Sequence, residues 1–96
     1  MFGEDIVQPV QEYTEIMNYS KHYKLLIDNG SKTKPKEGYY ELHHIVPRSL
    51  GGTDEPDNLV YLTGRAHFLA HWLLTKLHPE SREMAAAFWL FCNNTK

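Results

Sequence analysis

Two pairs of histidines constrain the fold of this chain more than any other feature of its sequence. His67 and His71 are four residues apart in a segment whose apolar residues recur at helical spacing, so both lie on one helix face and could share a metal ion. His43 and His44 are adjacent in an aromatic and β-branched stretch that predicts a strand, where neighbouring side chains point to opposite faces. Taken alone, each pair could instead be a coincidence of surface or packed histidines.

The two pairs together could form a catalytic metal site. If one strand histidine turned inward to join the helix pair, three protein ligands would leave a coordination position open. The other strand histidine could then act as a general base on water, because imidazole titrates near neutral pH. The zinc-protease motif is excluded because it needs Glu after the first helix histidine, where this chain has Phe68. The single cysteine, Cys92, excludes an internal disulfide framework and zinc sites built on paired cysteines.

The remaining pattern predicts one α+β domain, because 96 residues are too few for two hydrophobic cores. Thr63 is expected to cap the helix that carries the histidine pair. Four large apolar side chains are expected to fill the core: Met17, Trp72, Trp89 and Phe91. Apolar spacing and turn residues predict this order: a helix at about 12–28, a polar loop at 31–38, a strand at 39–46, a long loop, a strand at 59–62, and helices at 64–77 and about 81–91.

Charge is segregated along the chain. The formal net charge of −2 argues against gripping nucleic acid by bulk charge, but residues 1–16 contain four acids and no Lys or Arg, whereas residues 17–52 are rich in Lys. No apolar run approaches the roughly 18 residues of a membrane-spanning helix, and the amino terminus lacks the positive end of a signal peptide. A soluble cytoplasmic protein without a membrane partner is therefore expected.

A longer pattern joins the two histidine pairs. From His43 the chain reads His-His-Ile-Val-Pro-Arg-Ser-Leu-Gly-Gly, followed by Asn58-Leu-Val, by Leu-Thr and by the helix pair. This pattern resembles the HNH endonuclease family, and particularly its small bacteriophage members, many of them free-standing homing endonucleases. The resemblance implies a ββα-metal motif at about 39–77, in which a two-stranded hairpin with a long loop packs on a helix around one divalent ion. Flanking N-terminal and C-terminal helices are also common in those phage proteins.

The resemblance also implies a role for each matching residue. His43 would be the strand ligand of the metal, and His67 and His71 would be the helix ligands. His44 would be the general base, and Asn58 would hold it in place through hydrogen bonds across the long loop; an asparagine that merely starts a strand is the alternative. Three histidine ligands favour Zn²⁺, Mn²⁺, Ni²⁺ or Co²⁺, although Mg²⁺ could serve.

Several basic residues near the motif could hold the DNA backbone. Arg48 follows the first predicted strand and Arg65 begins the helix, where they could bind phosphates beside the metal. Lys32, Lys34 and Lys36 lie in the polar loop and could track the backbone. A solvated surface residue is the alternative for each of them.

These expectations describe a metal-dependent endonuclease of the phage homing type that hydrolyses phosphodiester bonds in double-stranded DNA. One site would nick one strand, so double-strand cleavage would need a homodimer or two successive nicks. The alternative is a non-catalytic, metal-stabilised module that binds nucleic acid or protein. Residues 17–96 would form the nuclease domain, and the acidic arm at 1–16 could dock on a second protomer or cover the basic face. No small-molecule cofactor is expected, and a phage-encoded nuclease would act in the host cytoplasm.

Overall fold

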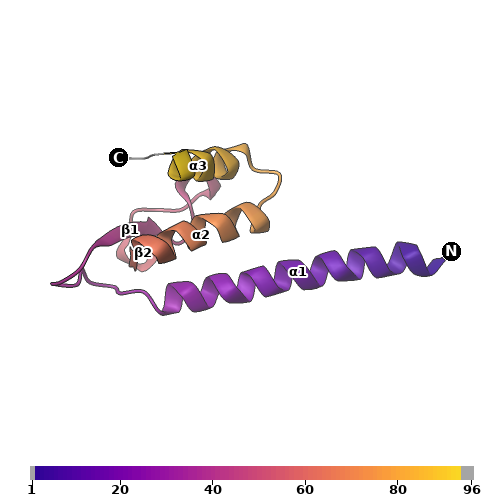
Figure 1. Ribbon diagram of the computed structural model, residues 1–96, viewed down its shortest axis with the longest axis horizontal. Helices are drawn as coiled ribbons and strands as arrows, with labels where there is room; N and C mark the ends of the chain where they lie inside the picture. Colours follow the sequence, from indigo (N-terminus) through magenta and orange to yellow (C-terminus); the bar gives the residue numbers. More distant parts are fainter. Residues whose placement is uncertain (1, 94–96) are drawn as a thin grey trace.

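A computed structural model describes the backbone of residues 2–93 and the side chains of residues 14–93. A two-stranded antiparallel sheet lies at one end of three helices, and α2 lies between α1 and α3 (Figure 1). The predicted α+β class and the hairpin-on-helix arrangement are therefore confirmed. In chain order the elements are α1 (Phe2–Asp28), β1 (Tyr40–His44), β2 (Leu59–Thr63), α2 (Gly64–Leu77) and α3 (Arg82–Asn93), with short 3-10 helices at Arg48–Leu50 and Pro56–Asn58.

The hairpin turns one histidine inward. In the β1–β2 register His43 lies opposite Val60, and His44 lies opposite Leu59. Directly paired residues of antiparallel strands share a face of the sheet, and successive residues alternate between faces. His43 is accordingly buried with Val60 against the helices, whereas His44 points to the other face and is partly exposed.

Helix α2 begins and ends where its sequence predicts. The Thr63 hydroxyl accepts a hydrogen bond from the backbone N–H of Ala66 at 3.1 Å, so the predicted N-cap is confirmed. After Leu77 the backbone N–H of His78 still donates to the Leu74 carbonyl, and Pro79 follows. This short, capped helix carries its buried side chains on the face towards the hairpin and neighbouring helices.

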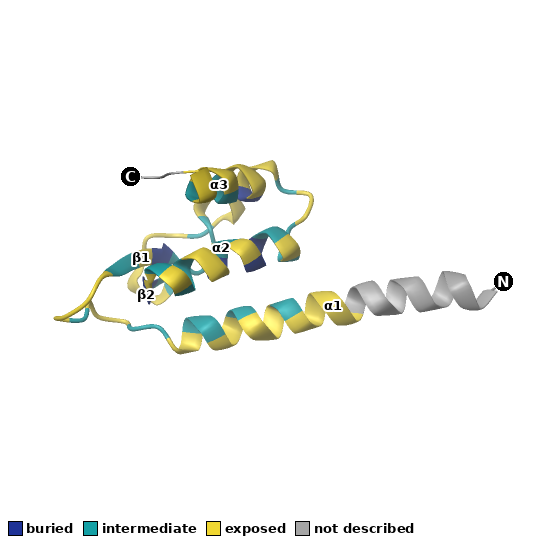
Figure 2. Ribbon diagram, viewed as in Figure 1, coloured by how far each residue is buried: buried dark blue, intermediate teal, exposed yellow. Residues whose placement is uncertain are grey.

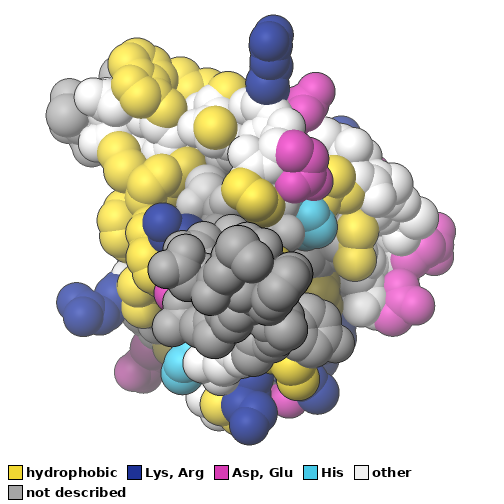
Figure 3. Space-filling view, turned by 90° about the vertical axis from the view of Figure 1, so that its right-hand side faces the viewer, with side chains coloured by type: hydrophobic (Ala, Val, Ile, Leu, Met, Phe, Trp, Pro, Cys, Tyr) yellow, Lys and Arg dark blue, Asp and Glu magenta, His cyan; other side chains and the backbone are white. Residues whose placement is uncertain are grey.

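The core is small, and the prediction of its large apolar members was mostly wrong. Val60, Leu62 and Ala70 form its centre. Met17 is 55% exposed, Trp89 is 62% exposed and Trp72 is 37% exposed, so these side chains do not fill it. The reason is the layering, because α1 and α3 each pack on α2 and have no further layer outside them (Figure 2). Seen along the long axis, hydrophobic side chains reach the surface, especially on the α3 side (Figure 3).

Helix α1 begins at Phe2, about ten residues before its predicted start. The prediction began where apolar side chains recur at helical spacing, but backbone hydrogen bonds can extend a helix without an apolar face. The boundary drawn at residue 16 therefore falls inside α1, and the arm's side chains up to residue 13 lie outside the described residues. Within the described part of the chain, no helix is long and apolar enough to cross a membrane.

The loop between the strands folds back tightly at its two glycines. Gly52 donates its backbone N–H to the Pro47 carbonyl at 2.9 Å, and a Cβ on Gly52 would stand only 1.7 Å from the Val46 carbonyl oxygen. Gly51 adopts a left-handed φ of 93°. These positions let the loop return beside the end of β1, where the candidate site lies.

Candidate active site

Three histidines from β1 and α2 meet at one point. His43, His67 and His71 each offer a ring nitrogen, and these atoms all lie within 4.8 Å of one another. The Nε2 atoms of His67 and His71 are 3.1 Å apart. Two nitrogens bound to one tetrahedral Zn²⁺ at its usual bond length would be separated by about 3.3 Å, so this pair fits a shared ion.

Tyr23, from α1, orients the strand histidine. Its hydroxyl donates to the Ile45 carbonyl at 2.7 Å and lies 2.8 Å from His43 Nε2. Because the phenol proton is used on the carbonyl, the hydroxyl oxygen can accept from His43 Nε2–H, which leaves Nδ1 with a free lone pair. Burial, and then the neighbouring imidazoles, lower the pKa of His43 to about 3. The ring is therefore neutral at neutral pH, as a metal ligand must be.

Glu41 plays the same part for His67 on α2. Its Oε1 accepts from His67 Nδ1 at 2.6 Å, which frees His67 Nε2, and its Oε2 accepts from the Tyr39 hydroxyl. The Tyr39 hydrogen bond, followed by the one from His67, lowers the pKa of Glu41. Burial lowers the pKa of His71 to about 4, so this ring is also neutral at neutral pH.

Helix α3 covers one side of the three histidines. The Phe91 ring lies edge-on to His67, with centroids 5.1 Å apart, and tilted against His71 at 5.4 Å. It also contacts Phe68 on α2. An apolar ring in this place keeps water from that side of the cluster.

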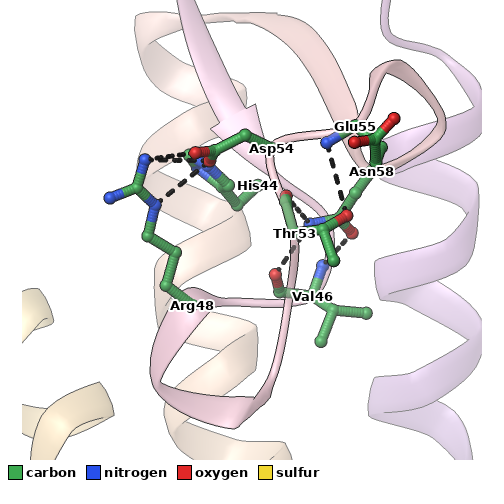
Figure 4. Close-up of polar contacts among 7 residues, drawn as sticks. All are labelled: His44, Val46, Arg48, Thr53, Asp54, Glu55 and Asn58. Carbon is green, nitrogen blue, oxygen red and sulfur yellow. Dashed lines mark hydrogen bonds and ion pairs between the residues drawn. The ribbon is translucent and has the colours of Figure 1, made fainter.

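The fourth histidine has a different set of partners (Figure 4). His44 Nε2–H donates to Asp54 Oδ1 at 2.8 Å. Arg48 binds the same carboxylate with Nε and Nη2, the shortest contact being 2.7 Å to Oδ2. The hydrogen bond from His44, and then those from Arg48, lower the pKa of Asp54. The Nδ1 atom of His44 is left as the basic nitrogen of the ring.

Asn58 ties the loop to the end of β1 and lies outside the histidine cluster. Its Oδ1 accepts from the Val46 backbone N–H at 2.8 Å. Its Nδ2 donates to the Val46 carbonyl at 3.0 Å and to the Thr53 carbonyl at 2.7 Å. Hydrogen bonds across the long loop, as predicted for this residue, are thus present (Figure 4).

The histidine cluster and two members of the His44 group border one cavity of about 370 Å³. The three clustered histidines lie on its wall together with His44 and Arg48. The three histidines that could hold a metal ion and the separate His44 therefore border the same space, an arrangement compatible with hydrolysis by an activated water.

Residues 30–65, which include both strands and the loop, match the family model described as HNH endonuclease. The chain belongs to the HNH endonuclease family. Similar proteins come from Enterobacteria phage T4. "Probable mobile endonuclease D" is 48% identical over 81 residues, or 80% of this chain and 31% of that protein. "Probable mobile endonuclease E" is 46% identical over 77 residues, or 80% of this chain and 54% of that protein.

"Probable mobile endonuclease C" of the same phage is 44% identical over 81 residues, or 81% of this chain and 38% of that protein. The HNH chain described here thus spans between about a third and about half of the length of these three relatives. No solved structure gives a significant match to it.

Of the basic residues predicted to contact DNA, Arg48 borders the cavity of the HNH site. Arg65, Lys34 and Lys36 are exposed and lie outside its lining. Lys32 has a structural contact, because its Nζ donates to the carbonyls of Pro56 and Leu59 across the loop.

Sequence reasoning missed the residues that orient the HNH histidines. Glu41 had a usable signal, because it lies two residues before His43 and therefore on the same strand face. Tyr23 and Asp54 had none, because their contacts depend on how α1 and the long loop fold back on β1.

Proposed function

We propose that this HNH domain is a metal-dependent endonuclease that hydrolyses phosphodiester bonds in double-stranded DNA and cuts one strand per site. The observation that carries the proposal is the fourth histidine. His44 borders the same cavity as the three clustered histidines, yet it is hydrogen-bonded to a carboxylate instead of joining them. A purely structural metal site has no use for such a residue. The relatives named as mobile endonucleases support a homing-type role.

One divalent ion would be held by His43, His67 and His71. When bound, it would act as a Lewis acid on the scissile phosphate and on the leaving oxygen. The three neutral nitrogen donors favour Zn²⁺, Mn²⁺, Ni²⁺ or Co²⁺ over Mg²⁺, which prefers oxygen ligands.

His44 would be the general base. Its Nε2–H is held by Asp54, so Nδ1 would accept a proton from a water molecule while the water oxygen bonds to phosphorus. The bond from phosphorus to the 3′-oxygen then breaks, and its electron pair leaves with that oxygen. Asn58 would act indirectly, because its hydrogen bonds fix the loop that carries the partner of His44.

DNA would be held by Arg48 at the cavity, and by Arg65, Lys32, Lys34 and Lys36 farther along the backbone. Each of these contacts is independent of base sequence, so strong sequence preference would have to come from elsewhere, such as a homodimer or a partner. Cleavage of both strands would likewise require a second site or a second nick. We place this activity in the cytoplasm of the host cell, as for a phage-encoded nuclease.

The test is nicking of supercoiled plasmid by the purified chain in Mn²⁺, Ni²⁺, Co²⁺, Zn²⁺ and Mg²⁺ at a stated salt concentration. We expect nicked circles with at least one of these ions. His44→Ala should keep the circular dichroism spectrum and the metal affinity while nicking falls by at least about 100-fold. Plasmid left intact by wild-type protein in every ion, despite bound metal, would favour the non-catalytic binding module.

A further inference from the structure

Asp54 joins two functional side chains through a single carboxylate. Its Oδ1 accepts from His44 Nε2 at 2.8 Å and from Arg48 Nε at 3.1 Å and Nη2 at 2.9 Å. Its Oδ2 accepts from Arg48 Nη2 at 2.7 Å. The general-base candidate and the phosphate-binding candidate therefore share one acidic partner (Figure 4), and no hydrogen bond joins the two within the described residues.

The loop holds this carboxylate in place through Asn58. Its amide nitrogen donates to the carbonyl of Thr53, the residue directly before Asp54. The same side chain accepts from and donates to Val46, two residues after His44. No hydrogen bond joins Asn58 to His44 within the described residues, so the asparagine reaches the base through Thr53 and Asp54.

The ion pair between Asp54 and Arg48 is weak enough for another anion to replace the Asp54 carboxylate. Their side chains are 63% and 69% exposed, and exposed ion pairs of this kind are worth at most about 1 kcal/mol. The guanidinium presents the two-donor edge that binds carboxylates and phosphates alike. A DNA phosphate entering the cavity beside Arg48 could therefore replace the carboxylate on that edge.

We infer that Asp54 is a positioning residue for His44 and also an internal competitor that holds Arg48 until a DNA phosphate takes its place. This inference rests on the proposed nuclease function. It implies two opposite effects of the same side chain: the hydrogen bond to Nε2 keeps the basic Nδ1 of His44 aimed for catalysis, while the carboxylate lowers the affinity of Arg48 for DNA.

Removal of Asp54 therefore has an unusual kinetic signature. In Asp54→Ala we expect kcat for plasmid nicking to fall about 100-fold because His44 can rotate, and KM to fall about threefold because Arg48 is freed. Asp54→Asn keeps an oxygen acceptor for His44 but removes the charge, so its kcat should lie between those of wild type and Asp54→Ala. A residue with a merely structural role would raise KM or leave it unchanged.

Asp57→Asn is the matched control. Asp57 is an exposed acid of the same loop and makes no side-chain hydrogen bond within the described residues, so its kcat should equal that of wild type. Duplex binding, measured by fluorescence anisotropy at one salt concentration, should be tighter for Asp54→Ala than for Asp57→Asn. This binding measurement does not depend on cleavage, so it tests whether Asp54 competes with DNA for Arg48 even if wild-type protein does not nick.

Two results would overturn the inference while leaving the nuclease assignment intact. One is wild-type cleavage with Asp54→Ala within twofold of it in kcat. The other is duplex affinity that is equal in Asp54→Ala and Asp57→Asn. Wild-type protein that binds metal and cuts nothing would instead contradict the proposed function.

Discussion

The two halves of the HNH site are built in different ways. The half that could bind the metal, called the ligand half, consists of His43, His67 and His71. It stands on a strand and a helix, with His43 buried and the other two half-buried. The base half, His44 and its partners, stands at the end of β1 and in an exposed loop held by side-chain hydrogen bonds. Secondary structure fixes the first half, whereas a few polar contacts fix the second. A substitution in one half should therefore impair that half and leave the other intact.

Loss of a helix ligand should have the largest effect. His67→Ala removes one of three donors and leaves the other imidazoles without their partner. We expect no measurable metal binding by isothermal titration calorimetry and loss of nicking by more than about 1,000-fold. His22→Ala, at an exposed position on α1, is the control and should retain both. Metal affinity unchanged in His67→Ala would remove this residue from the ligand half.

Removal of the Asn58 side-chain amide should disturb the base half without affecting metal binding. Asn58→Ala loses three hydrogen bonds, including the one that anchors the residue before Asp54. Nicking should fall by roughly 100-fold because His44 is no longer held, while metal affinity stays within about twofold. Parallel titration and cleavage assays check this, with the exposed Asn18→Ala as control. A parallel loss of metal affinity would show that the halves are not independent.

Lowering the pH should reduce the free energy of unfolding of the metal-free protein through its ligand half. The pKa of His43 is lowered to about 3 by burial, whereas an unfolded histidine titrates near 6.5. Between these values the unfolded chain binds a proton that the folded chain does not, so the free energy of unfolding should be constant above about pH 6.5 and fall below it. The loss at pH 5 should be about 2 kcal/mol from His43.

Urea denaturation in the presence of a chelator, repeated from pH 7.5 to pH 5, measures this slope. The carboxylates largely remain ionised over that range, so they add little to it. His43→Gln should reduce the slope by about half, because His71, whose pKa is lowered to about 4, still contributes to it, and His22→Gln should leave it unchanged. A wild-type stability independent of pH would contradict a neutral, buried His43.

The smallest expected effect comes from removing the charge of Glu41, which is hydrogen-bonded to His67. Glu41→Gln keeps a hydrogen-bond acceptor for His67 Nδ1 but removes the negative charge that strengthens the ligand. Metal affinity should fall about tenfold, with the fold unchanged by circular dichroism. Glu37→Gln, in the exposed loop before β1, should bind metal like wild type. Equal affinities in the two variants would mean that Glu41 only packs against the cluster.

Local patterns predicted where the three clustered histidines lie. The spacing of His67 and His71 and the cap at Thr63 depend on residues within one or two helical turns, so the sequence already contains the geometry. The alternation of a strand likewise separated His43 from His44. The metal-binding and catalytic roles of these residues remain predictions that the experiments above address.

Long-range packing was not predictable in the same way. Asp54 belongs to the base half only because the loop folds back, and Tyr23 reaches His43 only because α1 packs along α2. The number of packed layers also decides burial, which is why Trp89 is exposed on the outer face of α3 despite its apolar character. No periodicity in the chain carries that information.

The position of the histidine cluster has a consequence for folding. His43 belongs to the hairpin and His67 to the following helix, and Cys92 is the chain's single cysteine, so no disulfide joins these elements. One ion shared between them would serve as a removable cross-link in a protein with a small core. The resistance of the folded chain to heat and proteolysis would then rise and fall with the supply of metal around it.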